Sequence, residues 1–254
     1  MILPETPGFR LDGKRALITG AGRGLGLAAA AALAGAGAEV LLAARSEVEI
    51  EQAAAAIRNT GGKASALVLD VTRIEETTDR IARAGRIDIL CNNAGTNRPR
   101  PVWEVTEGDF DAVLDLNLKA AFFVARAVAV SMMDKGVKGS LIHMSSQLGH
   151  VGGASRSLYC ASKWALEGLS KSLALDLAPH GIRSNTIAPT FIETPMTKPF
   201  FEDQEFLKNV LARIKLGRLG RESDIMGAVV FLASDASAMM TGSSIVIDGG
   251  WTAD

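Results

Sequence analysis

Short apolar runs alternate with longer helical patterns along nearly the whole chain, and this alternation limits the possible folds more than any other feature. The candidate strands are rich in β-branched and aliphatic residues and span Arg15–Thr19, Glu39–Ala43, Ala64–Leu69, Ile87–Cys91, Ser140–Met144, Arg183–Ile187 and Ser244–Ile247. Between them lie helical segments that are rich in alanine or periodic in apolar residues, at Gly26–Gly35, Val48–Asn59, Phe110–Lys135 and Ser162–Leu177. Such alternation predicts a parallel sheet with helices on both faces.

The connections between these segments favour one domain. No linker rich in proline, serine or charge divides the 254 residues, and a chain of this length can bury enough surface to fold without a metal or a disulfide. We therefore expect a doubly wound α/β fold over residues 1–254. Ligands in such folds bind outside the carboxyl ends of the strands, so functional residues should directly follow strands.

One segment, Thr190–Arg213, departs from the regular alternation. It carries Pro195, Pro199 and an aromatic cluster of Phe200, Phe201 and Phe206, and it is too long for a simple connection. Long loops in compact domains often close over a ligand, so we predict a lid here. The alternative is an irregular surface helix.

Composition and charge exclude several function classes. The formal net charge of −1 argues against non-specific binding to nucleic acid or anionic lipid. The first residues lack the order of a secretory signal, and the apolar stretches are too short to span a bilayer. Neither the two cysteines, Cys91 and Cys160, nor the three histidines have metal-ligand spacing. These features predict a soluble cytoplasmic protein that acts on a small molecule without a metal ion.

A glycine-rich turn follows the first strand and opens an alanine-rich helix. It has the pattern T-G-x-x-x-G-x-G, and the residues we expect to contact a dinucleotide are Gly20, Arg23, Gly24, Leu25 and Gly26. Glycine lets the backbone approach a ligand closely, and the helix start offers free N–H groups and a partial positive charge to a pyrophosphate. This turn therefore predicts a nucleotide cofactor.

The end of the second strand indicates which cofactor. An acidic residue there would hold the ribose hydroxyls of NAD, but this strand ends in Ala44 and Arg45. Arg45 and Arg23 could instead pair with a 2′-phosphate, which guanidinium groups recognise well. We predict that NADP(H) is preferred, with NAD(H) as the alternative if both arginines are ordinary surface residues.

Tyr159 and Lys163 are the candidate acid–base pair. They are four residues apart at the start of a helical stretch and so share one face. A nearby ammonium favours the phenolate and lowers the pKa of the phenol, which makes it a usable proton carrier near neutrality. The spacing alone is common by chance, but Ser146 and the Asn92–Gly95 run also follow strands, and Asn117 stands within a helical segment.

Taken in order, these motifs and a closing Asp248-Gly-Gly resemble the short-chain dehydrogenase/reductase family over nearly the whole chain. The resemblance implies a Rossmann-type sheet, a homotetramer and a catalytic tetrad of Asn117, Ser146, Tyr159 and Lys163. Tyr159 would transfer the proton, and Lys163 would tune it and hold the nicotinamide ribose. Ser146 would orient the substrate oxygen, and Asn117 would anchor a water leading to Lys163.

The resemblance also implies a cofactor half at about residues 10–150 and a catalytic and substrate half at about 151–254. By the same resemblance, the cofactor cleft would be lined by Asp70, Val71, Asn92, Ala94, Gly95, Ile187, Pro189 and Thr194. One departure stands beside the cleft, because Thr190 occupies a position where the family often has glycine.

Three arginines are candidate substrate ligands. Arg98 and Arg100 follow the fourth strand, and Arg156 lies just before Tyr159. A guanidinium could receive a carboxylate, a sulfonate or a phosphate, although surface or subunit contacts would also explain it. Sugar-acid and polyol dehydrogenases of the family have a similar stretch, which favours such a substrate. The alternatives are a 3-oxoacyl thioester reductase and, from another class, a non-catalytic protein that senses the cofactor.

Overall fold

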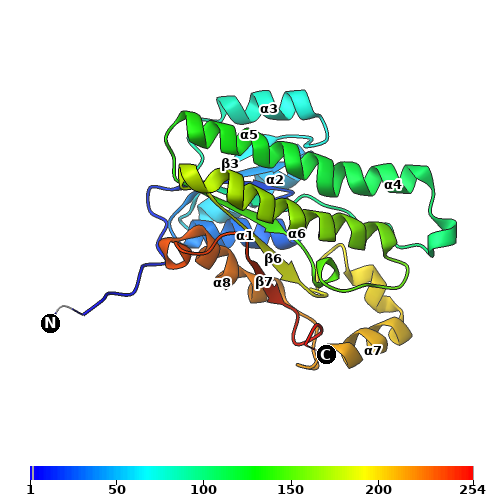
Figure 1. The fold of residues 1–254 in the computed structure, drawn as a ribbon. Helices are drawn as coiled ribbons and strands as arrows, with labels where there is room; N and C mark the ends of the chain where they lie inside the picture. Colours follow the sequence, from blue (N-terminus) through cyan, green and yellow to red (C-terminus); the bar gives the residue numbers. More distant parts are fainter. Residues whose placement is uncertain (2, 254) are drawn as a thin grey trace.

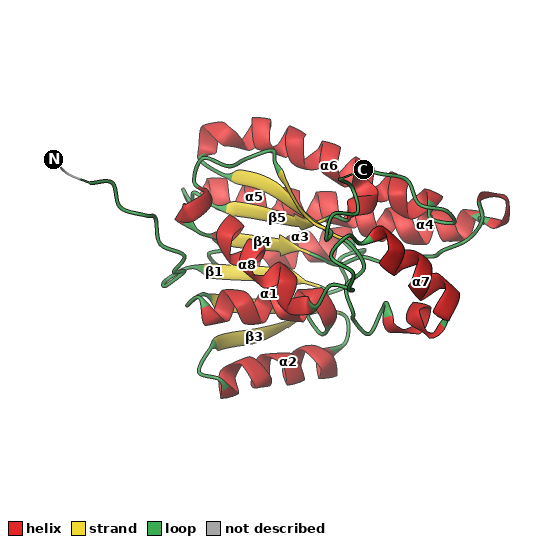
Figure 2. Cartoon of the chain, turned by 90° about the horizontal axis from the view of Figure 1, so that it is seen from below, coloured by secondary structure: helices red, strands yellow, loops and turns green. Residues whose placement is uncertain are grey.

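The computed structural model describes residue 1 and residues 3–253, and it forms a seven-stranded parallel sheet. The strands are β1 (Arg15–Thr19), β2 (Glu39–Ala44), β3 (Lys63–Val68), β4 (Ile89–Asn92), β5 (Ser140–Met144), β6 (Arg183–Pro189) and β7 (Ser244–Ile247). Their order is β3-β2-β1-β4-β5-β6-β7, so the chain builds outward from β1 in both directions (Figure 2). The predicted doubly wound, Rossmann-type sheet is confirmed, and its switch point between β1 and β4 is where such folds bind ligands.

Helices cover both faces of this sheet (Figure 1). One face carries α1 (Gly24–Gly35), α2 (Glu47–Asn59) and α8 (Glu222–Ala233), and the other carries α3 (Ile74–Arg83), α5 (Ala121–Asp134) and α6 (Ser157–Leu177). Two shorter helices, α4 (Glu107–Leu114) and α7 (Gln204–Arg213), lie beyond the carboxyl ends of the strands. No helix in the described part of the chain is long and apolar enough to cross a bilayer.

Alternating residues of the central strands feed two separate cores. In β1, Ala16 and Ile18 pack toward α1 and α8, whereas Leu17 packs toward α3 and α5. Leu17 is in register with Leu41 of β2 and Leu90 of β4, and all three are buried. Burial of one such side chain stabilises the fold by about 1.5–3 kcal/mol, so these layers hold the strand ends in fixed positions.

Every predicted strand is present, with boundaries that shift by at most two residues. The helical segment expected over Phe110–Lys135 is present, but it begins at Glu107 and contains a π-helical turn at Asp115–Ala120 between α4 and α5. A π turn inserts one residue into the helical repeat and commonly marks a functional position. Here it carries Asn117.

The segment Thr190–Arg213 is ordered around a short 3-10 turn and a helix. Ile192 bridges to Gly220, the turn spans Lys198–Glu202, and α7 follows at Gln204–Arg213. Phe191 packs against Phe206 with ring centroids 5.7 Å apart and against Trp251 at the same separation. The closure of the Thr190–Arg213 segment over a ligand stays a prediction.

Candidate active site

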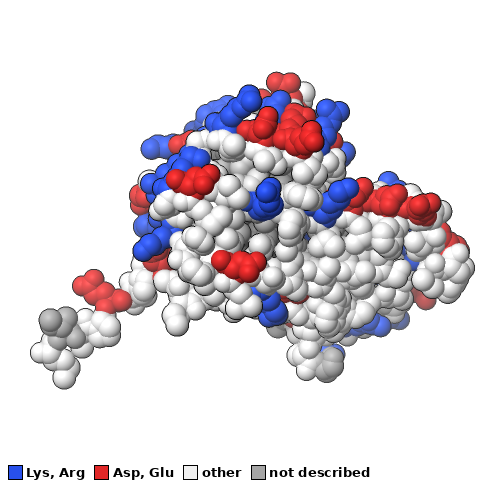
Figure 3. Space-filling model, turned by 45° about the horizontal axis from the view of Figure 1, so that its top comes forward, with Lys and Arg blue, Asp and Glu red and all other residues white. Residues whose placement is uncertain are grey.

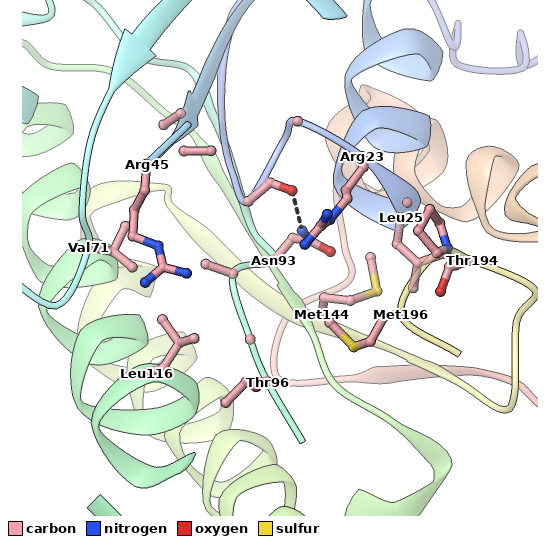
Figure 4. Close-up of a pocket in the computed structure, with 18 of the residues that line it drawn as sticks. Arg23, Leu25, Arg45, Val71, Asn93, Thr96, Leu116, Met144, Thr194 and Met196 are labelled. Atoms are coloured by element: carbon pink, nitrogen blue, oxygen red, sulfur yellow. Dashed lines mark hydrogen bonds between the residues drawn. The ribbon is translucent and has the colours of Figure 1, made fainter. Parts of the chain in front are cut away.

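A cavity of about 730 Å³ opens at the carboxyl ends of the strands. Most of the predicted site residues line it, namely Gly20, Arg23, Gly24, Leu25, Arg45, Asp70, Val71, Ala94, Gly95, Ser146, Tyr159, Lys163, Pro189 and Thr194. This volume lies within the range of small-molecule and cofactor sites. Figure 4 shows part of this lining, with Arg45 beside Val71.

Close backbone packing shapes the glycine turn. A Cβ on Gly26 would lie 2.2 Å from the carbonyl oxygen of Gly20, which only glycine avoids. Gly20 itself has φ +63°, a conformation that L side chains rarely adopt. Gly26 does not line the cavity, but it lets the first turn of α1 sit against the glycine turn, with its free N–H groups available to an anion. This cradle fits a dinucleotide pyrophosphate.

Hydrogen bonds between β1 and β4 brace the same region. Thr19 Oγ1 accepts from the backbone N–H groups of Asn93 at 2.9 Å and Ala94 at 3.0 Å. Asn93 Nδ2 donates to the carbonyls of Thr19 at 3.0 Å and Gly20 at 3.2 Å. The expected cleft residue Asn92 does not line the cavity, because its side chain is buried and donates to Ala121 O at 2.7 Å. Asn93 lines the cavity in its place.

Charged side chains line the cavity beyond the ends of β2 and β3. Asp70 Oδ1 accepts from Thr72 N at 3.0 Å and from Thr72 Oγ1 at 2.7 Å. Burial raises the pKa of Asp70, but the Thr72 hydrogen bonds and the nearby Arg45 outweigh it and keep the pKa below its usual value. Arg23 pairs with Glu49 at 3.3 Å, whereas Arg45 makes no ion pair with any described residue.

At the opposite end, the buried Lys163 faces Tyr159. Its Nζ donates to Met144 O at 2.7 Å and lies 5.5 Å from the centroid of the Tyr159 ring. Ser146 Oγ donates to Gln147 Oε1 at 2.8 Å and accepts from Leu148 N at 3.2 Å. These contacts bring the ends of β5 and α6 together on one wall of the cavity.

The π turn positions Asn117 behind this wall. Asn117 Oδ1 accepts from Thr96 N at 2.8 Å, and its Nδ2 donates to Thr96 O at 2.9 Å and Ser162 Oγ at 3.1 Å. The side chain therefore joins the segment after β4 to α6, where its partner Ser162 directly precedes Lys163 in the sequence. Asn117 does not itself line the cavity.

The pKa directions correct one expectation. Burial lowers the pKa of Lys163 to about 8, and the carboxylate of Glu167 opposes this change. Burial raises the pKa of Tyr159, against the opposing effects of Ser146 and Arg156. The predicted lowering of the Tyr159 pKa is therefore wrong for the protein alone, because loss of hydration outweighs the nearby positive charges.

Two of the three candidate substrate arginines share one carboxylate. Arg98 and Arg100 approach the buried carboxylate of Asp109 at 3.2 and 3.0 Å, and neither lines the cavity. They attach the segment after β4 to α4, and their role as substrate ligands stays a prediction. Arg156 also lies outside the cavity lining, but it has no acidic partner among the described residues and stacks 5.6 Å from the Phe200 ring.

Two buried hydroxyls in the cavity wall lack a partner. Ser145 Oγ and Thr190 Oγ1 make no hydrogen bond within the described part of the chain. A buried hydroxyl without a partner is unfavourable, so both are suited to a ligand that supplies one.

Known proteins with this arrangement are numerous. A family model described as enoyl-(acyl carrier protein) reductase matches residues 20–252. L-xylulose reductase of Bos taurus is 36% identical over 96% of this chain and 98% of its own length. The 3-oxoacyl-acyl-carrier-protein reductase of Thermotoga maritima is 40% identical, over 95% of this chain and 98% of its own length.

A solved structure agrees with these sequence relationships. The gluconate 5-dehydrogenase of Burkholderia cenocepacia, in complex with NADP and tartrate, superposes with a TM-score of 0.93 at 38% identity, over 97% of this chain and 98% of that one. The chain belongs to the short-chain dehydrogenase/reductase family. It is accordingly an oxidoreductase that acts on alcohol and ketone groups.

Sequence reasoning missed several residues of this dehydrogenase cavity. Asn93, Glu49 and Thr96 line the cavity and lie outside the predicted set. Glu49 did carry a signal, because Ser46-x-x-Glu49 is the pattern of a helix capping box. Glu167, a buried carboxylate one turn beyond Lys163, had no signal beyond its spacing in α6.

Proposed function

We propose that this chain is an NADP(H)-preferring dehydrogenase/reductase that interconverts a secondary alcohol and a ketone on a sugar acid, a polyol or a similar small hydroxy compound. The observation that carries the proposal is the convergence of Tyr159, Lys163 and Ser146 on one wall of a cavity whose other wall is a glycine turn. A pyrophosphate cradle and a proton carrier within one cavity are what hydride transfer to a carbonyl requires.

The chain's own residues would bind, orient and move a proton. The Ser146 hydroxyl donates to the substrate oxygen, and the Tyr159 hydroxyl gives that oxygen its proton in reduction or takes it in oxidation. The Lys163 ammonium stabilises the phenolate that remains, and Asn117 keeps α6 aligned with the segment after β4. A bound nicotinamide dinucleotide supplies the hydride, two electrons with one hydrogen nucleus, that converts the carbonyl carbon to an alcohol.

Two exposed cations favour the phosphorylated cofactor. Arg23 and Arg45 both line the cavity, and a guanidinium binds a phosphate by parallel hydrogen bonds. The NADP held by the Burkholderia relative supports the same preference. NAD(H) remains the alternative cofactor.

The substrate class draws its support from Arg156. Its guanidinium interacts with Tyr159 and is not neutralised by a carboxylate of the described chain, which suits an acidic hydroxy compound at the cavity rim. The tartrate of the Burkholderia complex is such a compound. A 3-oxoacyl thioester is the second candidate, and it is favoured by the apolar side chains of Leu116, Ile192 and Met196 in the same cavity.

We also propose a cytoplasmic homotetramer. Large apolar side chains are exposed on adjacent helices, at Phe110 of α4, Phe122 of α5 and Trp164 of α6. Figure 3 shows that charged side chains gather over the upper edge of the molecule and leave a broad, weakly charged area below it. Large apolar side chains exposed on neighbouring helices typically mark an interface, and light scattering in solution tests the assembly.

The direct test follows reduced-nicotinamide absorbance with both cofactors against aldonates, polyols and 3-oxoacyl thioesters. Turnover of aldonates or polyols is expected, and Tyr159→Phe should lower kcat by about three orders of magnitude while cofactor affinity stays nearly unchanged. Turnover of thioesters alone would replace the substrate class. Tight cofactor binding without turnover of any of them would support the sensor class, and full activity of Tyr159→Phe would overturn the mechanism.

A further inference from the structure

A carboxylate stands among the cationic groups at the adenosine end of the cavity. Glu49, in the first turn of α2, lines the cavity together with Arg23, Arg45 and Ser46. Its Oε1 lies 3.3 Å from Arg23 Nη1. Its other oxygen, Oε2, lies against the glycine turn, 3.0 Å from where a Cβ on Gly22 would be. A ligand phosphate that approaches Arg23 therefore meets this carboxylate.

The local sequence predicts a different position for the Glu49 side chain. Ser46-x-x-Glu49 is the capping-box pattern, in which the glutamate returns to the backbone N–H of the cap residue. The structure forms only the first half of this box, with Ser46 Oγ accepting from Glu49 N at 3.3 Å. At α4 the equivalent pair completes both halves, because Thr106 N also donates to Asp109 Oδ2 at 3.3 Å. The Glu49 carboxylate is thus diverted from the cap to Arg23.

The pair is weak enough to be exchanged. The side chains of Arg23 and Glu49 are 69% and 41% exposed, and ion pairs in that environment contribute little to stability. A 2′-phosphate carries more charge than a carboxylate and offers more acceptor oxygens, so it competes well for the same guanidinium. The uncompleted capping box gives Glu49 a favourable second position near the helix N-terminus.

We propose that Glu49 is a specificity-determining residue that acts as a displaceable counter-ion of Arg23. It weakens binding of a 2′-phosphorylated dinucleotide, leaves an unphosphorylated dinucleotide unaffected, and so narrows the preference of the site between the two. This inference rests on the proposed function, because it takes a dinucleotide as the ligand of the cavity.

Direct titration of binding tests this proposal without turnover. In Glu49→Gln the Kd of NADPH should fall by about tenfold, since one nearby negative charge is removed from the phosphate site, and the Kd of NADH should stay the same. The fragments 2′,5′-ADP and 5′-AMP, used as inhibitors or calorimetric ligands, should repeat this difference. Higher ionic strength should reduce it, because both partners are exposed to solvent.

Glu47→Gln is the matched control. Glu47 lies in the same first turn of α2 and carries the same charge, but it does not line the cavity. We expect no change of the NADPH-to-NADH ratio in that variant. In an Arg23→Gln background, the effect of Glu49→Gln should shrink, because the competition for Arg23 is already absent.

Each outcome decides between the alternatives. An equal shift of both cofactors, weaker NADPH binding in Glu49→Gln, or the same effect in Glu47→Gln would overturn the inference and leave the proposed function standing. Failure of both cofactors to bind the unmodified protein would overturn the proposed function itself.

Discussion

The two ends of the cavity are built in different ways. The pyrophosphate end is made of backbone, in which Gly20, Gly26 and the first turn of α1 are held by contacts that tolerate no side chain. The substrate end is made of side chains on long connections, including Thr190 and Met196. Because the strands hold the glycine turn, we expect cofactor recognition to be fixed by the sheet. Substrate recognition, in contrast, can vary through the segment after β6 without disturbing the sheet.

The largest effect is expected from a substitution at the glycine turn, which forms the pyrophosphate end. Gly26→Ala places a Cβ 2.2 Å from Gly20 O, so α1 must move away from the glycine turn and withdraw its N–H groups from the pyrophosphate. We expect the Kd of NADPH to rise by about a hundredfold or more. Binding is measured by quenching of intrinsic fluorescence, with circular dichroism to confirm that the variant is folded.

Gly35→Ala is the control for this change. Gly35 ends the same helix, and a Cβ there has no heavy atom within 4 Å. Its affinity for NADPH should stay unchanged. Equal affinity of Gly26→Ala and the unmodified protein would show that the close approach of α1 to the turn has no role in binding.

The second prediction concerns the substrate end. Arg156→Leu should raise KM for an acidic hydroxy compound by about tenfold, because a carboxylate loses a guanidinium partner, and should change kcat less. KM for an uncharged polyol should not change. Arg98→Leu removes the same charge from a residue engaged with Asp109 and serves as the control. An equal rise of KM for acidic and neutral substrates would contradict a carboxylate site at Arg156.

The sequence predicted these two ends unequally. The order of apolar runs and the glycine spacing predicted the sheet and the cradle, because steric rules for strands and glycines act locally. The ion pairs of Arg98 and Arg100 with Asp109 were not predicted, since no local pattern shows that this helix residue turns back toward them. The π turn at Asn117 was not predicted either, because no local pattern distinguishes it from the α-helices on both sides.

A smaller effect is expected at Thr190, where a substitution removes a single hydroxyl from the substrate end. Thr190 Oγ1 is buried in the cavity wall without a partner in the described chain, so a bound ligand that supplies one gains a hydrogen bond. Thr190→Val keeps the shape and should weaken binding of the cofactor or the substrate by about fivefold. Thr190→Ser should retain most of the affinity. Equal binding by the valine and serine variants would show that the hydroxyl contacts no ligand.

The smallest expected effect is a shift of the pH profile, and it tests the cavity wall formed by Ser146, Tyr159 and Lys163. Lys163 has its pKa lowered to about 8, so its ammonium is present below that pH and is lost as the pH rises through it. The kcat/KM of the free enzyme should therefore fall above about pH 8. Burial is the larger cause of this pKa and Glu167 the opposing one.

Replacing Glu167 separates these two causes. Glu167 accepts from Thr186 Oγ1 at 2.8 Å and lies 3.4 Å from His150 Nε2, and a glutamine retains one acceptor oxygen there. Glu167→Gln removes the negative charge that favours the ammonium, so the alkaline limb should move to lower pH by up to about one unit. Thermal denaturation checks that the variant is intact. A limb that stays in place would mean that burial alone sets the Lys163 charge, and a limb that moves to higher pH would assign the titration to another group. If the limb stays in place, the cavity wall that carries Tyr159 and Lys163 is tuned by packing rather than by charge, as the glycine turn is.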